Sequence, residues 1–460
     1  MESKLKMIDR EPYVSIGLMA GVEKVRFELK GEFAGRDGAR FNTGSFLATT
    51  DAGRIEIINT SGDRLSLSSD FQLTPAEPRF SFVIHDVVIG IDFHWQQKQA
   101  LEFQGVFRIK LGSDGQLIVI NENSVESYLT SVISSEMSAA SHPELLKAHS
   151  IISRSWLLAQ LEQWKMPRQA APGRSEIEGD SKQLLRWYDR ESHADFDVCA
   201  DDHCQRYQGI TKATSPAVFE SVHSTLGQVL TYGSTLCDTR FSKSCGGMTE
   251  SYRAAWGEEE IPYLAVSYDG ESFPSGFNLP LSDETNAAVW ICNSPLAFCN
   301  TDDQKILAKI LPDFDQETTD FYRWRVELKQ EDLRDLLRDK LGVDFGAILK
   351  LQPVERGQSG RIVKLRIAGE RETMVIGKEL EIRRALSPTH LYSSAFVVET
   401  GRNTFSAPEH FTLIGAGWGH GVGLCQIGAA IMAERGYNHR QILAHYYRDA
   451  QLHTLYSESA

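Results

Sequence analysis

The N-terminal quarter of the chain alternates apolar and polar residues over short segments, a pattern typical of β-strands. Gly, Asp, Asn and Ser separate these segments, as expected of turns. The segments are Val14–Leu18, Lys24–Leu29, Arg54–Ile58, Phe80–Ile84, Val87–Phe93, Phe107–Ile109 and Leu117–Ile120. Residues 12–120 carry no catalytic pattern, and we expect them to form a β-rich scaffold.

Beyond residue 120 the apolar residues recur at helical spacing instead. They do so from Val125 to Ile133, and Ser141 followed three residues later by Glu144 marks the start of a second helix. Helices are also expected at Gln330–Leu341, Gln426–Arg435 and Ile442–Tyr447, and strands at Ile348–Val354, Ile362–Ile367 and Met374–Ile376. We therefore predict an α+β fold, with the β-rich region at 12–120 followed by a mixed domain at 121–455.

Two polar stretches interrupt the mixed domain. Residues at about 165–192 are expected to form a surface excursion with one short helix. Residues at about 270–345 form a second insertion, which contains the helical pattern at Gln330–Leu341.

Charge and hydropathy exclude several classes of function. The 460 residues include 48 Lys or Arg and 62 Asp or Glu, and the formal charge of −14 argues against binding of nucleic acid. No apolar run approaches the roughly 18 residues that span a bilayer, so no transmembrane segment is expected. Met1–Arg10 has no apolar core, so no secretory signal is expected either, and the protein stays in the cytoplasm or needs an export signal that this chain lacks.

The cysteine count gives little sign of a disulfide framework. Seven cysteines in 460 residues are few, and an odd number leaves at least one unpaired. Cys292 and Cys299 are candidates for a bridge if the protein is exported, and in a reducing compartment we expect buried thiols.

Glu136 is the first candidate for chemistry. It lies between two helical segments, beside Met137 and two alanines. Apolar surroundings disfavour the charged form of a carboxylic acid, and a general acid must hold its proton. The alternative is a solvated surface residue. Lys147 and Arg154 follow on one face of the next helix, seven residues apart.

The first glycine-rich segment, Phe241–Glu250, combines paired glycines with polar side chains. Gly246 and Gly247 allow backbone N–H groups to approach a ligand. Ser244, Thr249 and Glu250 supply hydroxyl and carboxylate groups that suit a polyhydroxylated substrate. The alternative is a turn between two strands.

The second glycine-rich segment, Gly415–Gly428, has five glycines at alternate positions from 415 to 423, which leave one side without side chains. Close packing within the core and close approach of a ligand, with His420 and Gln426 beside it, are the two interpretations. The glycine spacing matches neither type of phosphate-binding loop.

Four residues of the kinds that bind zinc lie within twelve positions, at His193, Cys199, His203 and Cys204. Thiolate and imidazole ligands suit a structural zinc ion. The spacing differs from that of a standard zinc finger, and neighbouring His203 and Cys204 point apart unless a turn brings them together. Three ligands with a water molecule, or no metal, are the alternatives.

Several long motifs, in this order, resemble the SpoIID/LytB family. They are VESYLTSVISSEMSAASHPELLKAHSIISRSW (125–156), CQRYQGI (204–210), FSKSCGGMTESYRAAWGEEEIPYLAV (241–266), SGRIVKLRIAG with EIRRAL and LYSSAF (359–396), and GWGHGVGLCQIGAAIMAERGYNHRQILAHYY (417–447). The resemblance covers most of 122–450. Cys425 stands where the family often has Ser, and Cys245 lies within the Ser-Gly-Gly turn.

The resemblance implies a protein that remodels peptidoglycan in the cell envelope. It implies a lytic transglycosylase that acts on peptide-stripped glycan strands, with Glu136 as the catalytic acid. It also implies that the two glycine-rich segments line the substrate groove, and that the two insertions alter its width. Lys147 and Arg154 then either favour the Glu136 carboxylate or bind the lactyl carboxylate of muramic acid, unless they are solvated helix charges.

The resemblance leaves alternatives open. Related LytB proteins are described as amidase enhancers, so a non-catalytic glycan-binding protein that stimulates an amidase is the second hypothesis. Some family members hold a zinc ion near the segment that matches 193–204. A zinc amidase is a weaker third hypothesis, because this segment is separate from Glu136 and no HExxH motif occurs. A single carboxylic acid suits a lytic transglycosylase, whereas ordinary glycosidases need two.

Overall fold

The computed structural model describes residues 8–457 except 68, 92–95, 139, 164–176, 179–180, 187–192, 202, 214, 312–317 and 402–406. The chain forms two compact units. Unit 1 comprises Met1–Met166, Arg190–Val229 and Leu452–Ala460, and unit 2 comprises Pro167–Asp189 and Leu230–Gln451. The division expected at residue 120 instead falls inside a strand of unit 1, because strand β12 (Leu117–Ser124) runs directly into helix α1 (Val125–Glu136).

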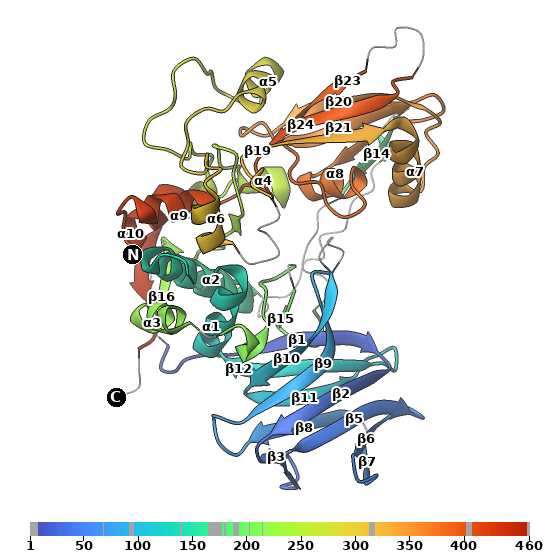
Figure 1. The fold of residues 1–460 in the computed structure, drawn as a ribbon, viewed down its shortest axis with the longest axis vertical. Helices are drawn as coiled ribbons and strands as arrows, with labels where there is room; N and C mark the ends of the chain where they lie inside the picture. Colours follow the sequence, from blue (N-terminus) through green and yellow to red (C-terminus); the bar gives the residue numbers. More distant parts are fainter. Residues whose placement is uncertain are drawn as a thin grey trace. The chain divides into compact units, whose positions relative to one another are not determined.

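The N-terminal region of unit 1 is β-rich, as predicted (Figure 1). One sheet has the order β15-β1-β12-β11-β8-β3-β4 and the other has the order β10-β9-β2-β5-β6-β7. Its further strands are β1 (Tyr13–Val22), β2 (Lys24–Lys30), β3 (Phe33–Gly35), β4 (Arg40–Phe41), β5 (Gly44–Asp51), β6 (Arg54–Asn59), β7 (Arg64–Leu67), β8 (Asp70–Pro75), β9 (Ser81–Ile89), β10 (Gln97–Gln104), β11 (Val106–Leu111) and β15 (Val198–Cys199).

Aromatic side chains join these two sheets. Phe27 of β2 lies with its ring centroid 4.7 Å from that of Phe107 in β11 and 6.4 Å from that of Phe71 in β8. Phe82 of β9 also contacts Phe107, at 4.8 Å. The apolar faces of the two sheets therefore pack on each other, which explains the alternation of apolar and polar residues along the strands.

Three α-helices complete the part of unit 1 that the structure describes. Ser124 caps the N-terminus of α1, because its side chain accepts a hydrogen bond from the N–H of Ser127. The helix ends at Glu136. Helices α1, α2 (Pro143–Gln163) and α3 (Pro216–Ser224) pack against one another, and a short 3-10 helix, η1 (Gly209–Thr211), precedes α3. Burial of Leu129, Leu146 and Val222 accounts for the helical spacing of the apolar residues.

Unit 2 is a mixture of helices and short sheets. Its sheets have the orders β13-β14-β22-β21-β20, β19-β24-β23 and β18-β25. Its strands are β13 (Ile177–Glu178), β14 (Ser181–Leu185), β17 (Thr235–Leu236), β18 (Phe241–Ser242), β19 (Arg323–Lys329), β20 (Ile348–Arg356), β21 (Ile362–Gly369), β22 (Thr373–Gly377), β23 (Phe396–Thr400), β24 (His410–Ala416) and β25 (Leu424–Cys425). Its helices are α4 (Tyr252–Ala255), η2 (Pro262–Leu264), α5 (Glu284–Cys292), α6 (Gln304–Ile310), α7 (Gln330–Leu341), α8 (Glu379–Ala385), α9 (Gln426–Glu434) and α10 (His439–Tyr446). Strands β16 (Gln228–Tyr232) and β26 (Gln451–Thr454) lie where the chain passes between the units.

The α+β prediction is confirmed. In the first insertion, β14 pairs in parallel with β22. Residues 164–176, 179–180 and 187–192, which make up most of the stretch where one short helix was expected, lie outside the described residues. The second contains α5, α6 and α7, and it contributes the buried side chain of Trp290. The helix predicted at Gln330–Leu341 is α7.

Among the described residues, none of the helices has the length and apolar character needed to cross a membrane.

Candidate functional site

Glu136 is the last residue of α1, and its side chain is largely shielded from solvent. The residue is 9% exposed. Its Oε1 accepts a hydrogen bond of 3.0 Å from the backbone N–H of Arg206. No other hydrogen bond to the Glu136 carboxylate is formed within the described part of the chain. The carboxylate is therefore held by one oxygen, and its second oxygen, Oε2, accepts no hydrogen bond from the described residues.

Cys204–Tyr207, the segment whose Arg206 N–H binds Glu136, is itself held against α1 and β12. Tyr128 of α1 donates a hydrogen bond from its hydroxyl to Gln205 Oε1, at 3.3 Å. The ring of Tyr207 stacks on that of Tyr128, with centroids 5.2 Å apart, and its hydroxyl donates to Asn121 Oδ1 at 2.5 Å. These contacts anchor Cys204–Tyr207 and so fix the N–H that binds Glu136.

Two of the four candidate zinc ligands, Cys204 and the preceding His203, lie in or next to this segment. We call His193, Cys199, His203 and Cys204 the histidine–cysteine cluster; their donor atoms all lie within 4.8 Å of one another. Cys204 Sγ is 3.3 Å from His193 Nε2 and 3.6 Å from His203 Nδ1. A turn, closed by the hydrogen bond from Cys204 N–H to Asp201 C=O, lets neighbouring His203 and Cys204 face the same point. Two thiols and two imidazoles so arranged fit a tetrahedral zinc ion.

Thiol pKa values in this cluster follow from the same contacts. The neighbouring Cys204 thiol, and then burial, raise the pKa of Cys199 to about 11. Without a metal the Cys199 thiol is therefore protonated at neutral pH. A zinc ion binds thiolates and displaces such protons.

Arg154 of α2 does not contact Glu136, contrary to one of the expected roles. Its guanidinium is fully buried and donates to both carboxylate oxygens of Glu126, with Nε–Oε1 at 2.8 Å and Nη2–Oε2 at 2.6 Å. Glu126 lies in the first turn of α1 and Glu136 is its last residue, so the two are about 15 Å apart along the helix axis. The buried pair of Arg154 with Glu126 lies at the opposite end of α1 and favours a structural role for Arg154.

Lys147 has a local partner. Its Nζ lies 2.8 Å from Glu144 Oε1, one turn earlier on α2, and both side chains are partly exposed. This is a surface pair of a kind that contributes little to stability. Its predicted role toward substrate stays a prediction.

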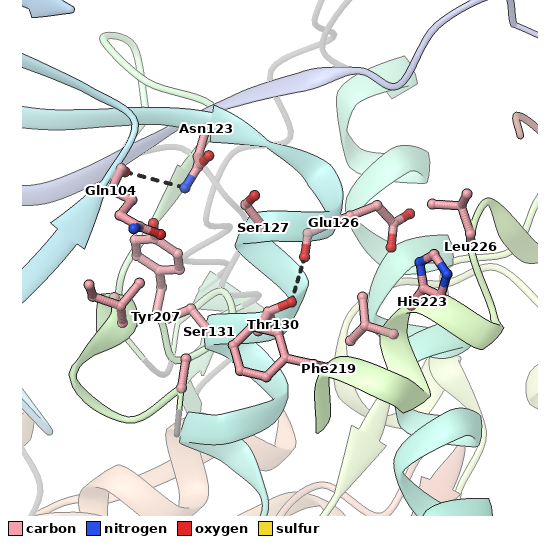
Figure 2. A pocket seen from close by; sticks show the side chains of 14 residues that line it. Gln104, Asn123, Glu126, Ser127, Thr130, Ser131, Tyr207, Phe219, His223 and Leu226 are labelled. Atoms are coloured by element: carbon pink, nitrogen blue, oxygen red, sulfur yellow. Dashed lines mark hydrogen bonds between the residues drawn. The ribbon is translucent and has the colours of Figure 1, made fainter. Parts of the chain in front are cut away.

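A cavity of about 260 Å³ in unit 1 lies on the side of α1 that carries Glu126 and Thr130 (Figure 2). Tyr207, Phe219 and His223 also line it, and Glu136 does not. Polar groups around this cavity are engaged within the protein: Asn123 Nδ2 donates to Gln104 C=O at 3.3 Å, and Thr130 Oγ1 donates to Glu126 C=O at 2.9 Å. No pattern in the sequence predicted this cavity.

In unit 2 the two glycine-rich segments lie side by side. Strand β18 pairs in parallel with β25, and further bridges join Ser244 to Trp418 and Glu250 to Val422. Two segments about 175 residues apart in the chain are thus brought together.

The glycines of the second segment are needed for packing within the protein. A Cβ atom at Gly421 would lie 2.3 Å from Arg361 Cζ, and one at Gly423 would lie 2.0 Å from the carbonyl oxygen of Arg240. Both glycines have positive φ, +75° and +72°, which side chains rarely adopt. Of the two interpretations, close packing is the one that the structure supports.

Four predicted sugar-binding residues are buried. Glu250 Oε2 accepts hydrogen bonds from the N–H and hydroxyl of Ser359, at 3.1 and 2.7 Å, and Thr249 Oγ1 exchanges hydrogen bonds with the backbone of Ser267. Ser244 and Gln426 are also buried. These contacts favour the alternative of a packed turn, because polar groups turned into the protein offer no exposed surface to sugar.

The backbone at the paired glycines is also covered by protein. A Cβ atom at Gly246 would lie 2.8 Å from the amide nitrogen of Gly417, and one at Gly247 would lie 2.8 Å from Trp290 Cζ2. Neighbouring chain, rather than open space for a ligand, occupies these positions.

His420 is partly buried and lies among aromatic and cationic side chains. Its Nδ1 accepts the N–H of Val422 at 3.0 Å, and its ring lies 4.5 Å from that of Trp256. Burial, and then the charge of Arg240, lower the pKa of His420 well below its ordinary value, so the ring is neutral at neutral pH. Trp256, which our reading of the sequence did not single out, lies between the Arg240 guanidinium, 4.4 Å from its ring, and His420.

Comparison with known proteins points to one family. Residues 113–232 match the family model described as stage II sporulation protein. The chain is therefore similar to the SpoIID/LytB family, most directly over this stretch. Residues 250–423 match a second model, described as a domain of unknown function (DUF8618).

Individual relatives show the same similarity. Stage II sporulation protein D of Bacillus amyloliquefaciens is 25% identical over 332 residues, which cover 71% of this chain and 74% of the relative. Stage II sporulation protein D of Bacillus subtilis (strain 168) is 24% identical over 329 residues, with the same coverage of 71% and 74%. An amidase enhancer of Bacillus subtilis (strain 168) is 22% identical over 240 residues, which cover 50% of this chain but only 31% of that relative.

The SpoIID match falls on the part of the chain that contains both Glu136 and the histidine–cysteine cluster. Both glycine-rich segments lie wholly outside it, and the match of 250–423 covers Glu250 and the first nine residues of the second segment. The candidate acid and the candidate metal ligands thus belong to one unit and to one matched stretch.

Proposed function

We propose that this protein remodels peptidoglycan in the cell envelope, as a lytic transglycosylase that cleaves peptide-stripped glycan strands with Glu136 as its acid and base. The observation that carries the proposal is the setting of Glu136, a nearly buried carboxylate anchored through Oε1 by the Arg206 N–H. This hydrogen bond orients the carboxylate and leaves Oε2 available to the substrate. The two relatives named stage II sporulation protein D support a role in the cell wall.

One carboxyl group suffices for this reaction. Protonated Glu136 gives its proton to the glycosidic oxygen as the bond to the muramyl carbon breaks through an oxocarbenium-like transition state. The resulting carboxylate then takes the proton of the muramyl 6-hydroxyl, whose oxygen closes a 1,6-anhydro ring. Glu250 is the other carboxylate among the candidate site residues. It is hydrogen-bonded to Ser359 in the interior of unit 2, which supports the single-acid scheme.

The proposal is tested by mass analysis of the products released from glycan strands with and without stem peptides. We expect soluble fragments that end in 1,6-anhydromuramyl residues, and more of them from the peptide-stripped strands. Products with a reducing muramic acid end would show that water is the acceptor, and would contradict the scheme.

A second candidate function rests on the likeness to the amidase enhancer. In that case the protein binds glycan and stimulates a separate amidase without cleaving any bond itself. The two candidates differ when the purified protein is incubated alone with peptide-stripped glycan. Release of soluble sugar favours the transglycosylase, and its absence together with faster peptide release by an added amidase favours the enhancer.

We also propose that the histidine–cysteine cluster holds one structural zinc ion. Bound zinc contributes folding energy and no chemistry here, because four protein ligands leave no open position for water. That argues against the zinc amidase hypothesis. His203 and Cys204 stand just before Arg206, so their ligation steadies the N–H that holds Glu136.

The zinc proposal makes a prediction for Cys204→Ser. This variant should lose one equivalent of zinc per chain and melt at a lower temperature, because removal of one ligand weakens the metal contribution to folding. Metal analysis and thermal unfolding check this, with Cys292→Ser, an exposed thiol outside the cluster, as the matched control. Unchanged zinc content in Cys204→Ser after metal-replete expression would refute the site.

A further inference from the structure

Unit 2 contains a second group of metal-ligand residues, which belong to none of the sites described above. Cys245, Asp269, Cys299 and Cys425 are all buried, and one donor atom from each lies within 4.8 Å of the others. We call these residues the three-thiol cluster. Cys245 comes from the first glycine-rich segment, Cys425 from the second, and Asp269 and Cys299 from the chain between them.

The distances within this cluster match those of ligands around one ion. Cys245 Sγ is 3.6 Å from Cys299 Sγ and 3.4 Å from Asp269 Oδ2. For tetrahedral zinc, bond lengths of about 2.3 Å to sulfur and about 2.1 Å to oxygen place two sulfurs about 3.8 Å apart, and a sulfur and an oxygen about 3.6 Å apart. A disulfide would require about 2.05 Å between the sulfurs. The thiols are therefore spaced as co-ligands.

Hydrogen bonds to the donor atoms orient them and favour their anionic forms. Cys425 Sγ accepts the N–H of Cys245 at 3.2 Å and that of Gly428 at 3.4 Å, as the N-cap of α9. Asp269 Oδ2 accepts the N–H of Cys299 at 3.1 Å, and its Oδ1 accepts the hydroxyl of Tyr446 at 2.7 Å. Partners of this type, one step beyond the ligands, are the ones that hold metal ligands in place.

Simple packing explains this arrangement less well. Buried thiols behave as small apolar groups and need no partner. Asp269, however, is 0% exposed and turns one oxygen toward Cys245, although a buried carboxylate requires compensation for its lost hydration. The nearest basic side chain among the described residues is His445, with Nε2 3.7 Å from Oδ1. A divalent ion between Oδ2 and the three sulfurs would place a positive charge in direct contact with this oxygen.

We propose that Cys245, Asp269, Cys299 and Cys425 bind one soft divalent metal ion, for which zinc is the best match. Thiolate-rich tetrahedral ligand sets select zinc among the common divalent ions. A filled site has a net charge of −2, the same as the common four-cysteine zinc sites, so burial of this charge is no obstacle. The ion cross-links the two glycine-rich segments to the chain around Cys299. This proposal does not depend on the proposed enzymatic activity.

Metal analysis of single-site variants of the full chain tests the proposal. Cys299→Ala should lose one equivalent of zinc per chain relative to the parent. Cys237→Ala is the matched control, because Cys237 is an equally buried thiol of unit 2 outside the cluster, and it should lose none. Equal metal content in Cys299→Ala and the parent would overturn the proposal, and so would a disulfide between Cys245 and Cys299 in the purified protein.

A second measurement does not require Cys299→Ala to fold. In the Cys199→Ala/Cys204→Ala variant, which lacks two ligands of the histidine–cysteine cluster, one metal ion should remain, with three sulfur neighbours by X-ray absorption. Native alkylation followed by mass analysis should label Cys245, Cys299 and Cys425 only after a chelator is added. A metal-free variant, or a remaining ion with two or fewer sulfur neighbours, would refute the assignment.

Discussion

Replacement of Glu136 by glutamine should lower the rate of cleavage of peptide-stripped glycan by a factor of about 10²–10⁴ or more. Glutamine keeps the shape of the side chain, and its carbonyl oxygen can still accept the N–H of Arg206. It can neither give a proton to the glycosidic oxygen nor take one from the 6-hydroxyl. The rate of release of soluble fragments by purified Glu136→Gln, measured against the parent, checks this prediction.

The effect must be separated from a loss of folding or binding. Glu136→Gln should melt at a temperature close to that of the parent and still sediment with insoluble glycan. Glu162→Gln is the matched control, because Glu162 is an exposed glutamate near the end of α2, and it should keep full activity. Full activity of Glu136→Gln would overturn the assignment. No activity in the parent would instead favour the amidase-enhancer candidate.

Much of the fold follows from the periodicity of apolar residues, where one face of an element is buried. Strand β11 and helix α1 follow their patterns because Phe107 and Ile109, or Leu129 and Ile133, face a core. Short-range capping was also predictable. Asn438 and Gln441 form a capping box at the start of α10, as the residue types indicated.

Edge strands were harder to predict. Strand β10 is at the edge of its sheet, and only Leu101 and Phe103 of its eight residues are buried. With one side of the strand free of neighbours, few positions require an apolar residue, so the alternation on which a prediction depends is weak. The expected division at residue 120 falls within β12, which pairs within the N-terminal sheet and continues directly into α1, with no linker between them.

The candidate site was predictable only where its residues are close in the sequence. The histidine–cysteine cluster spans twelve residues and could be proposed from spacing. In the three-thiol cluster, Cys245 and Asp269 are 24 residues apart and Asp269 and Cys299 are 30 apart, so no local pattern reveals it. Arg361 packs against the side of the second glycine-rich segment that has no side chains, and this contact could not be predicted for the same reason. Arg361 donates a hydrogen bond to the carbonyl of Gly419, which is 58 residues away in the chain.

The environment of Arg154 illustrates a further limit. Its position on one face of a helix suggested a charge available to substrate, but whether a charged group is solvated or paired depends on tertiary contacts. Its partner, Glu126, lies on another helix and also accepts the hydroxyl of Tyr456, at 2.6 Å. Residue type and helical spacing contain no information about that pairing.

Arg154→Met should therefore destabilise unit 1 by about 3–5 kcal/mol, because it leaves the Glu126 carboxylate without its buried cationic partner. Lys147→Ala, on the same helix, removes only a partly exposed pair with Glu144 and should cost about 0.5 kcal/mol or less. Urea unfolding of both variants measures the two values.

A double variant separates the buried pair from a role in substrate binding. Arg154→Met/Glu126→Leu removes both charges and should recover part of the stability lost in Arg154→Met, because no unpaired carboxylate remains in the interior. If Arg154 instead binds the lactyl carboxylate of muramic acid, Arg154→Met would unfold at the same urea concentration as the parent and lose affinity for glycan. The full burial of the guanidinium, and its two short hydrogen bonds to Glu126, are the reasons to expect the loss of stability.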